Sequence, residues 1–171
     1  MWPRRRLDQL VRAHLPDLYR FALRLERNPA HAEDLLQSAF LRAVPRIGQL
    51  REDGAFRAWM KRIVYTTWQN TLAKRRDLHL ADTNVVPLAQ EQPDQTADAR
   101  GVGRQLAAAL DALPSHQREA VWLVDGQGHT YAEAAEILGV QPGTTASRVA
   151  RGRAAMRVQL ETVAREQGMI R

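Results

Sequence analysis

The sequence predicts an all-α protein of two small helical domains joined by a flexible linker, with a helix-turn-helix in the second domain. Apolar residues recur with a helical period on both sides of a stretch that has no sustained period. No segment alternates apolar and polar residues as a half-buried strand does. The segment Thr130–Met156 contains a short amphipathic helix, a glycine turn and a second helix with arginines and no acid, which is the pattern of a helix-turn-helix.

The first domain, residues 1–77, begins with two predicted helices. Apolar residues repeat at helical spacing over Leu7–Leu25, with a kink expected at Pro16, and Asn28-Pro29 interrupts the pattern. A second helix is predicted over Ala30–Val44, with its apolar side chains on one face.

A loop and a third helix complete the first domain. Proline, glycine and charged residues predict a loop over Pro45–Asp53, and Gly54–Arg76 follows as a helix. The residues expected to face inward are Phe56, Trp59, Met60, Ile63 and Val64. Residues 78–103 contain prolines, glycines and polar residues without a period, so they are predicted to be a linker between domains.

The second domain, residues 104–171, is again predicted to be helical. A helix over Arg104–Leu113 stops at Pro114. Ser115 is expected to cap the N-terminus of the next helix, which glycines end.

The helix-turn-helix carries its own start and stop signals. Thr130, with Glu133 three residues later, predicts a capping box, and Gly139 suits the left-handed backbone of the turn. The long last helix begins at Pro142 and runs to Glu166. Its expected core face consists of Thr145, Val149, Gly152 and Met156. Its expected outer face, where a groove-reading helix presents side chains, consists of Thr144, Ser147, Arg148 and Arg151.

The chain is basic, which favours a polyanionic partner. Its 171 residues carry a net charge of +6, and the pI is about 10.6. Residues 1–77 hold 16 Lys and Arg against 8 Asp and Glu, whereas residues 105–171 hold 7 of each kind. Most of the positive charge therefore lies outside the helix-turn-helix, which is not expected of a simple repressor.

Several classes of protein are disfavoured by what the sequence lacks. The absence of cysteine excludes disulfides and thiolate metal sites, and it fits a cytoplasmic location. No apolar run is long enough for a signal peptide or a membrane span, so no membrane insertion is expected. The histidines are scattered, and no phosphate-binding loop or pair of facing carboxylates appears, so we expect no metal, no cofactor and no enzymatic activity.

Two blocks of sequence resemble a known family. LYRFALRLERNPAHAEDLLQSAFLRAV (Leu18–Val44) and FRAWMKRI (Phe56–Ile63) resemble the first conserved domain of bacterial RNA polymerase sigma factors of the extracytoplasmic-function (ECF) group. ALDALPSHQREAVWLV (Ala109–Val124), followed by YAEAAEILGV and PGTTASRVARGRAAM, resembles the second conserved domain of that group. The resemblance implies a promoter-specificity subunit whose partners are core RNA polymerase, promoter DNA and an inhibitory anti-sigma factor.

The resemblance also implies a role for each domain. The first would bind polymerase and would recognise and melt the minus-ten element, and the second would read the minus-thirty-five element as duplex. The residues implied in polymerase binding are Asp34, Gln37, Ser38 and Arg42. Those implied in minus-ten contacts, on the outer face of the third helix, are Arg57, Lys61, Arg62, Tyr65, Thr66 and Asn70. Those implied in minus-thirty-five contacts are Thr144, Ser147, Arg148, Arg151 and Arg153, the last of them on a phosphate or in an intramolecular pair.

The recognition helix departs from the family pattern at three positions. Thr145 stands where the family usually has Val, so a buried hydroxyl at this position needs a backbone partner. Ala146 and Ala150 replace larger or basic side chains. Alanine can touch a thymine methyl group but cannot donate a hydrogen bond, so base reading should depend mainly on Ser147 and Arg151.

Two other interpretations stay open at the level of the sequence. An autonomous helix-turn-helix regulator would bind operator DNA as a dimer without polymerase, at two half-sites about one helical turn apart. A protein-interaction module that mimics a sigma factor would bind polymerase and yield no promoter-dependent transcript.

Overall fold

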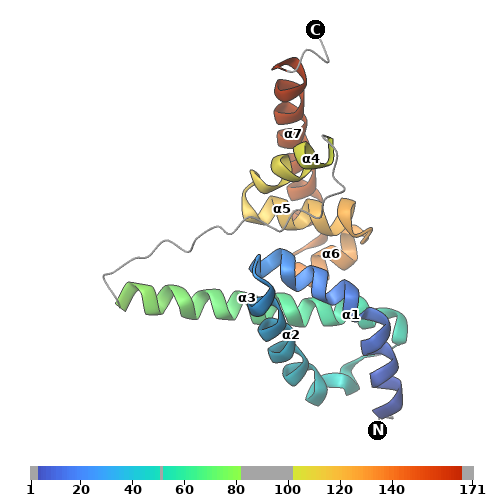
Figure 1. The fold of residues 1–171 in the computed structure, drawn as a ribbon. Helices are drawn as coiled ribbons and strands as arrows, with labels where there is room; N and C mark the ends of the chain where they lie inside the picture. Colours follow the sequence, from blue (N-terminus) through green and yellow to red (C-terminus); the bar gives the residue numbers. More distant parts are fainter. Residues whose placement is uncertain (1–3, 51, 82–101, 167–171) are drawn as a thin grey trace. The chain divides into compact units, whose positions relative to one another are not determined.

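The structure is a computed structural model that describes residues 4–50, 52–81 and 102–166. These residues form helices and short turns, and no strand occurs among them, which confirms the all-α prediction. The chain divides into two compact units, Met1–Pro93 and Asp94–Arg171, each with its own set of helices (Figure 1).

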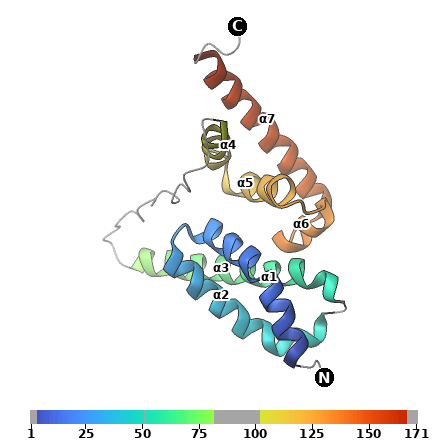
Figure 2. The same ribbon diagram turned by 45° about the vertical axis from the view of Figure 1, so that its right-hand side comes forward.

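The described residues of the first unit form three long helices and two short 3-10 segments. In chain order these are α1 (Arg4–Glu26), α2 (Pro29–Ala43), η1 (Val44–Gln49), η2 (Asp53–Ala55) and α3 (Phe56–Ala81). The three long helices pack against one another and form a small bundle (Figure 2). The segment Pro45–Asp53, predicted to be a loop, is partly 3-10 helix, because Pro45 fits the first turn of η1, where no backbone donor is needed.

The first two helices follow signals in the local sequence. Asn28 caps α2, since its side-chain oxygen accepts a hydrogen bond from the backbone N–H of His31 at 3.1 Å, and Pro29 is the first residue of the helix. Pro16 lies inside α1, and the helix changes direction along its length (Figure 1), as a proline in a helix interior predicts. Capping and proline geometry therefore shape this part of the bundle.

The core of the first unit lies between the three long helices. Its buried apolar side chains include Leu18, Phe21, Ala22, Ala32, Leu35, Leu36, Ala39, Phe56, Met60 and Val64. The apolar stripes predicted on the second and third helices face this core. Trp59, also predicted to be core, is only partly buried and lies beside Phe56, with the ring centroids 6.1 Å apart.

The third helix is longer than the sequence predicts. Its expected end is Arg76, whereas α3 continues to Ala81, because the intervening residues include neither proline nor glycine. The predicted linker, residues 78–103, therefore begins as helix. Residues 82–101 lie outside the described residues, and the next helix begins at Val102.

Between residues 102 and 166, the second unit forms four α-helices and one π-helical segment. In chain order these are α4 (Val102–Asp111), α5 (Ser115–Val121), η3 (Trp122–Gly126), α6 (Tyr131–Leu138) and α7 (Pro142–Glu166). The prediction that Ser115 caps α5 is wrong, since Pro114 occupies the N-cap position and Ser115 is the first helical residue. The Pro114 carbonyl accepts hydrogen bonds from the backbone N–H groups of Gln117 and Arg118, at 2.9 and 3.0 Å. The extended backbone that proline favours thus starts this helix one residue earlier.

The last helix organises the core of the second unit. α7 packs against α4, α5 and α6. These partner helices and the turn between α4 and α5 contribute the buried side chains Ala109, Leu113, Ala120, Val121, Ala134, Ala135, Ile137 and Leu138. Gly152 lies where α7 crosses α5, and a Cβ at this position would be only 2.5 Å from Cγ2 of Val121. The glycine therefore permits the close approach of the two helices.

Candidate nucleic-acid interface

The helix-turn-helix predicted by the sequence is formed by α6 and α7. The Thr130 hydroxyl accepts a hydrogen bond from the backbone N–H of Glu133 at 3.2 Å, and the Glu133 carboxylate accepts one from the Thr130 backbone N–H at 2.8 Å. Gly139 follows α6 with a φ of 68°, and the Val140 N–H donates to the Ala135 carbonyl at 3.0 Å. The predicted capping box and glycine turn are both confirmed.

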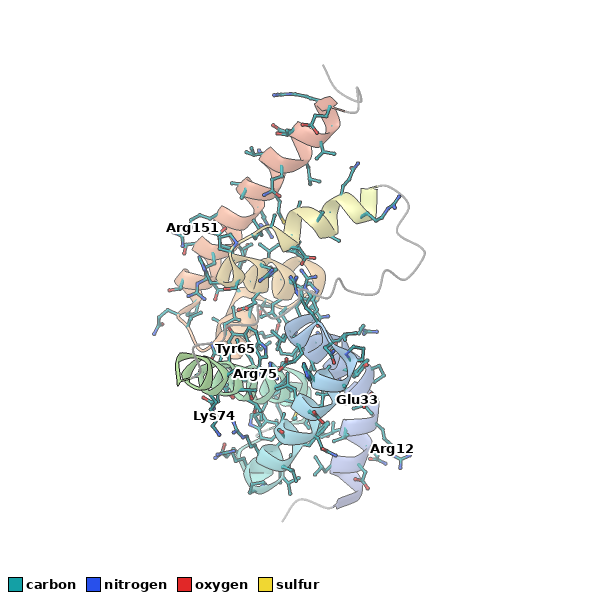
Figure 3. All side chains as sticks on the ribbon, turned by 60° about the vertical axis from the view of Figure 1, so that its left-hand side comes forward. Arg12, Glu33, Tyr65, Lys74, Arg75 and Arg151 are labelled. Carbon is teal, nitrogen blue, oxygen red and sulfur yellow. The ribbon has the colours of Figure 1, made fainter. Side chains whose placement is uncertain are left out.

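The second helix of the motif, α7, has one buried face and one outward face. The buried face consists, as predicted, of Thr145, Val149, Gly152 and Met156. On the outward face Ser147 and Arg151 are exposed, while Thr144 and Arg148 are partly buried. Arg151 Nη2 lies 3.5 Å from Ser147 Oγ, and Figure 3 shows Arg151 projecting from α7. The two side chains are therefore close enough to meet the same ligand.

Arg153 makes an ion pair inside the second unit. Its Nε and Nη2 donate to the two carboxylate oxygens of Asp125 at 2.9 and 2.5 Å, and its Nη1 lies 3.4 Å from the Tyr131 hydroxyl. The sequence leaves two partners open for this arginine, a DNA phosphate or an acceptor within the protein, and the structure contains the pair within the protein. Because its donors point to acceptors within the protein, Arg153 is not counted among the exposed donors of the outward face.

Two residues predicted on the outer face of α3 are buried instead. Lys61 is 0% exposed and Tyr65 is 6% exposed, so the prediction that these two side chains lie on the outer face of the helix is wrong. Lys61 Nζ lies 2.9 Å from Asp17 Oδ2 of α1. Tyr65 packs against Trp68, with the ring centroids 5.7 Å apart. An ammonium group can be buried where a carboxylate pairs with it, and that pairing depends on how two distant helices pack.

Asp17 of α1 forms ion pairs with several cationic side chains of α1 and α3. Its Oδ2 accepts a hydrogen bond from Arg57 Nε at 2.7 Å as well as one from Lys61, and Arg20 lies 3.8 Å from Oδ1. Burial raises the pKa of Asp17, but the hydrogen bonds from Arg57 and Lys61 outweigh it and lower the pKa to about 2. Burial lowers the pKa of Lys61 to about 8, against the opposing effect of Asp17. Arg57, predicted to contact minus-ten DNA, is thus partly buried and engaged within the protein.

A neighbouring row on α3 is exposed. Arg62, Thr66 and Asn70 are four residues apart, and all three are exposed, as the outer-face prediction requires. Lys74 continues the same spacing and is also exposed (Figure 3), although it was not among the predicted residues. Because Lys74 lies four residues after Asn70, the spacing in the sequence is sufficient to predict that it belongs to this row. At about 1.5 Å per residue, the row extends over roughly 18 Å of helix.

The residues implied in polymerase binding share one exposed surface of α2. They are Asp34, Gln37, Ser38 and Arg42. Leu41 is 75% exposed and Val44, just after the helix, is 56% exposed, and neither was predicted to belong to this surface. In the sequence, each is a large apolar residue that lies outside the apolar stripe of the helix, and this feature could have predicted their exposure. The combination of polar and unpaired apolar groups is typical of a protein-binding surface.

An apolar groove of about 680 Å³ lies within the second unit, between α4, η3 and α7. Its apolar lining includes Leu106, Leu110, Val121, Trp122, Met156 and Leu160. Such a surface fits an apolar segment of a protein better than it fits nucleic acid.

The two units correspond to two known families of domain. Residues 10–77 match the family model of Sigma-70 region 2, and residues 103–156 match that of Sigma-70, region 4. A chain that carries these two regions in this order, each on a helical unit, has the organisation of a sigma factor. Among its relatives are the ECF RNA polymerase sigma factors EcfG of Rhodopseudomonas palustris and SigM of Mycobacterium tuberculosis. The chain belongs to this ECF group of sigma factors, which is not a family of enzymes.

The similarity to these relatives covers most of the chain. This chain is 37% identical to EcfG, and the match covers 84% of this chain and 78% of EcfG. It is 38% identical to SigM, and that match covers 86% of this chain and 73% of SigM. It is also 38% identical to SigE of Mycolicibacterium smegmatis, but that match spans only 60% of SigE.

A solved structure has the same fold. It is the co-crystal structure of the sigma factor RpoE in complex with the anti-sigma factor NepR from Bartonella quintana. The matching chain of that structure is 28% identical in sequence to this chain, with a TM-score of 0.73. The match covers 91% of this chain and 96% of that one. Across the part of the chain that the structure describes, no helix has the length and apolar character needed to cross a bilayer.

Proposed function

We propose that this chain directs core RNA polymerase to particular promoters as an ECF sigma factor. One observation carries the proposal. A helix-turn-helix with outward polar donors lies on one unit, and a long helix with an exposed basic and amide row lies on the other. A simple operator-binding regulator needs only the first of these. The relatives matched over most of the chain are sigma factors, which also disfavours an autonomous regulator.

Runoff transcription with purified core polymerase and this protein on a genomic library tests the proposal. We expect promoter-selective transcripts that require the protein, and only weak duplex binding by the protein alone. If the protein binds polymerase but no selective transcript appears, it is an interaction module instead. Tight binding to paired half-sites without polymerase would support the autonomous regulator.

We assign residues 1–77 to polymerase binding and minus-ten recognition, and the exposed surface of α2 to the polymerase contact. The polar residues of that surface surround Leu41, whose burial against a partner would release apolar surface from water. Leu41→Glu should weaken binding to core polymerase in a fluorescence anisotropy titration. Leu15→Glu, at an exposed leucine of α1, is the matched control and should bind as wild type does.

The row on α3 is the surface that we assign to the melted minus-ten strand. Arg62 and Lys74 offer cations for phosphates, and Thr66 and Asn70 offer hydrogen-bonding groups for unstacked bases. The strong positive charge of residues 1–77 favours a single-stranded DNA ligand here, since such ligands need a positive groove.

We assign residues 104–171 to the minus-thirty-five element and residues 78–103 to the connection between the two DNA contacts. Ser147 and Arg151 are the residues proposed to read base edges, because they are exposed and adjacent on the outward face of α7. Thr144 and Arg148, which are partly buried, are proposed to contact the flanking phosphates.

An anti-sigma factor is the further partner that we propose, with the groove beside α4 as its docking surface. The B. quintana relative of similar fold binds an anti-sigma factor, and the groove here offers an apolar surface for a segment of such a protein. Leu106→Glu should release transcription from inhibition by the cognate anti-sigma factor while uninhibited transcription persists. Unchanged inhibition would place the docking surface elsewhere.

A further inference from the structure

The ion pair between Asp125 and Arg153 joins three elements of the helix-turn-helix unit. Asp125 lies in η3, Arg153 lies near the middle of α7, and Tyr131 is the first residue of α6. The guanidinium uses two nitrogens for the two carboxylate oxygens and directs a third toward the Tyr131 hydroxyl. A planar guanidinium paired in this bidentate manner fixes orientation as well as distance.

The backbone around Asp125 is unusual. Residues 122–126 form a π-helix, in which one extra residue per turn changes the direction of the side chains that follow, and such segments are frequent at functional sites. This π-helix continues α5 directly, so it links the end of α5 to α7 through Asp125. The pair therefore bridges α7 to the elements that precede it in the chain.

Arg153 lies on a different side of α7 from the proposed base-reading residues. At about 100° per residue, two positions separate it from Arg151 by roughly 200° around the helix. Arg153 therefore does not extend the surface formed by Arg151 and Ser147. The pair itself is surface-exposed, with side-chain exposures of 51% and 38%, so its contribution to overall stability should be small.

We propose that Asp125 is a positioning residue for promoter recognition: it holds Arg153, and through Arg153 sets the orientation of α7 so that Ser147 and Arg151 meet base edges. The inference rests on the proposed reading of the minus-thirty-five element by α7. Asp125 does not touch DNA, and it acts through the angle of the helix. The competing role, in which Arg153 binds a DNA phosphate, makes the opposite prediction, because Asp125 would then compete with the phosphate.

The test uses the full chain with core polymerase and measures transcription from a cognate promoter across a range of salt concentrations. Asp125→Asn and Arg153→Lys should each reduce promoter use by about 2- to 5-fold, because an exposed ion pair can bias the orientation of α7 only by its own small interaction energy. The charge reversal that combines Asp125→Arg with Arg153→Asp should recover most of the loss. Glu161→Gln, which removes one negative charge from exposed α7 surface, is the matched control and should leave promoter use unchanged.

Each outcome is decisive. Increased promoter use by Asp125→Asn, with a steeper dependence on salt, would mean that Arg153 contacts phosphate and would overturn the inference. Unchanged use by Asp125→Asn, while Arg151→Ala loses activity, would overturn the inference and leave the proposed function intact. If Arg151→Ala is also without effect, the proposed reading by α7 fails, and the inference fails with it. Melting temperatures close to wild type for Asp125→Asn and the charge reversal would exclude unfolding as the cause of any loss.

Discussion

Lys61 Nζ lies 2.9 Å from Asp17 Oδ2, and this ion pair joins α3 to α1 inside the first unit. The lysine side chain is fully buried, whereas the carboxylate keeps 16% of its surface exposed and also accepts a hydrogen bond from Arg57. One carboxylate therefore accepts hydrogen bonds from two cationic side chains in the most basic part of the chain. This arrangement makes Asp17 important for stability, although nothing places it in contact with DNA.

Asp17→Asn should lower the free energy of unfolding by about 2–4 kcal/mol, because it leaves the Lys61 ammonium buried without its counter-charge. Urea denaturation followed by circular dichroism measures the change. Asp8→Asn, at an exposed position of the same helix, is the control and should stay within about 0.5 kcal/mol of wild type. Equal effects of the two substitutions would contradict the role given to the ion pair.

Stability should also depend on acid pH through Asp17. Its pKa in the folded chain is about 2, below the ordinary value of 3.8, so folding favours the ionised form. The resulting contribution, about 2 kcal/mol, is fully present above pH 3.8 and is lost as the pH falls toward 2. The difference in unfolding free energy between wild type and Asp17→Asn should therefore shrink over this interval. A difference that stays constant there would show that ionisation of Asp17 does not stabilise the fold.

Gly152→Ala should destabilise the second unit by about 1–3 kcal/mol, although alanine is the better helix former. The new Cβ would lie 2.5 Å from Val121 Cγ2 and 3.3 Å from Leu113 Cδ1, so α5 and α7 must move apart. Calorimetry of the full chain measures the loss. Gly143→Ala is the control, since its Cβ meets nothing within 4 Å, and it should be neutral or slightly stabilising. A neutral Gly152→Ala would mean that the crossing of α5 and α7 is not closely packed.

Thr145→Val should raise the free energy of unfolding by about 1–2 kcal/mol. Thr145 is 0% exposed, and its Oγ1 makes no hydrogen bond with any described residue, so the hydroxyl is desolvated without compensation. Valine fills nearly the same volume and has no polar atom. Thr162→Val, at an exposed threonine of the same helix, should change stability much less in the same thermal melts. A loss of stability in Thr145→Val would imply that the hydroxyl has a partner, for example an ordered water.

Arg151→Ala and Lys74→Ala should weaken promoter use in different ways. Loss of a base contact at Arg151 should cost about 1–3 kcal/mol and depend on the promoter sequence. Loss of a phosphate contact at Lys74 should affect all promoters alike and reduce the dependence on salt. Runoff assays on several promoters at several salt concentrations separate the two patterns. A uniform, salt-dependent loss in Arg151→Ala would assign that arginine to phosphate instead.

The accuracy of the sequence-based predictions varies with the range of the interaction involved. The capping box of Thr130 and Glu133, the glycine turn at Gly139 and the buried face that includes Val149 were all predicted, because they depend on residues within one or two turns. The exposed row through Arg62 was predicted for the same reason. Its extension to Lys74 follows the same spacing and could have been found.

The errors have two causes: packing between distant helices, and competition between adjacent signals for the start of a helix. Lys61 and Tyr65 are predicted to form an outward row from their four-residue spacing, but packing of α1 against α3 supplies Lys61 with the Asp17 carboxylate. Ser115 was expected to cap a helix that Pro114 starts, since the choice between two adjacent start signals depends on backbone geometry. The sequence could not decide the partner of Arg153, because the fold of η3 determines that Asp125 lies beside it.

The sequence by itself determined the helical class, the helix-turn-helix and the resemblance to ECF sigma factors, since helical periodicity, capping and motif spacing are local properties of the chain. Only the tertiary structure decided which charges are available to a partner. A lysine or arginine has the same helix position whether it faces solvent or a carboxylate, and only the packing of distant helices distinguishes the two. That packing withdraws Lys61 and Arg153 from the candidate surfaces and leaves Arg62, Lys74 and Arg151 exposed.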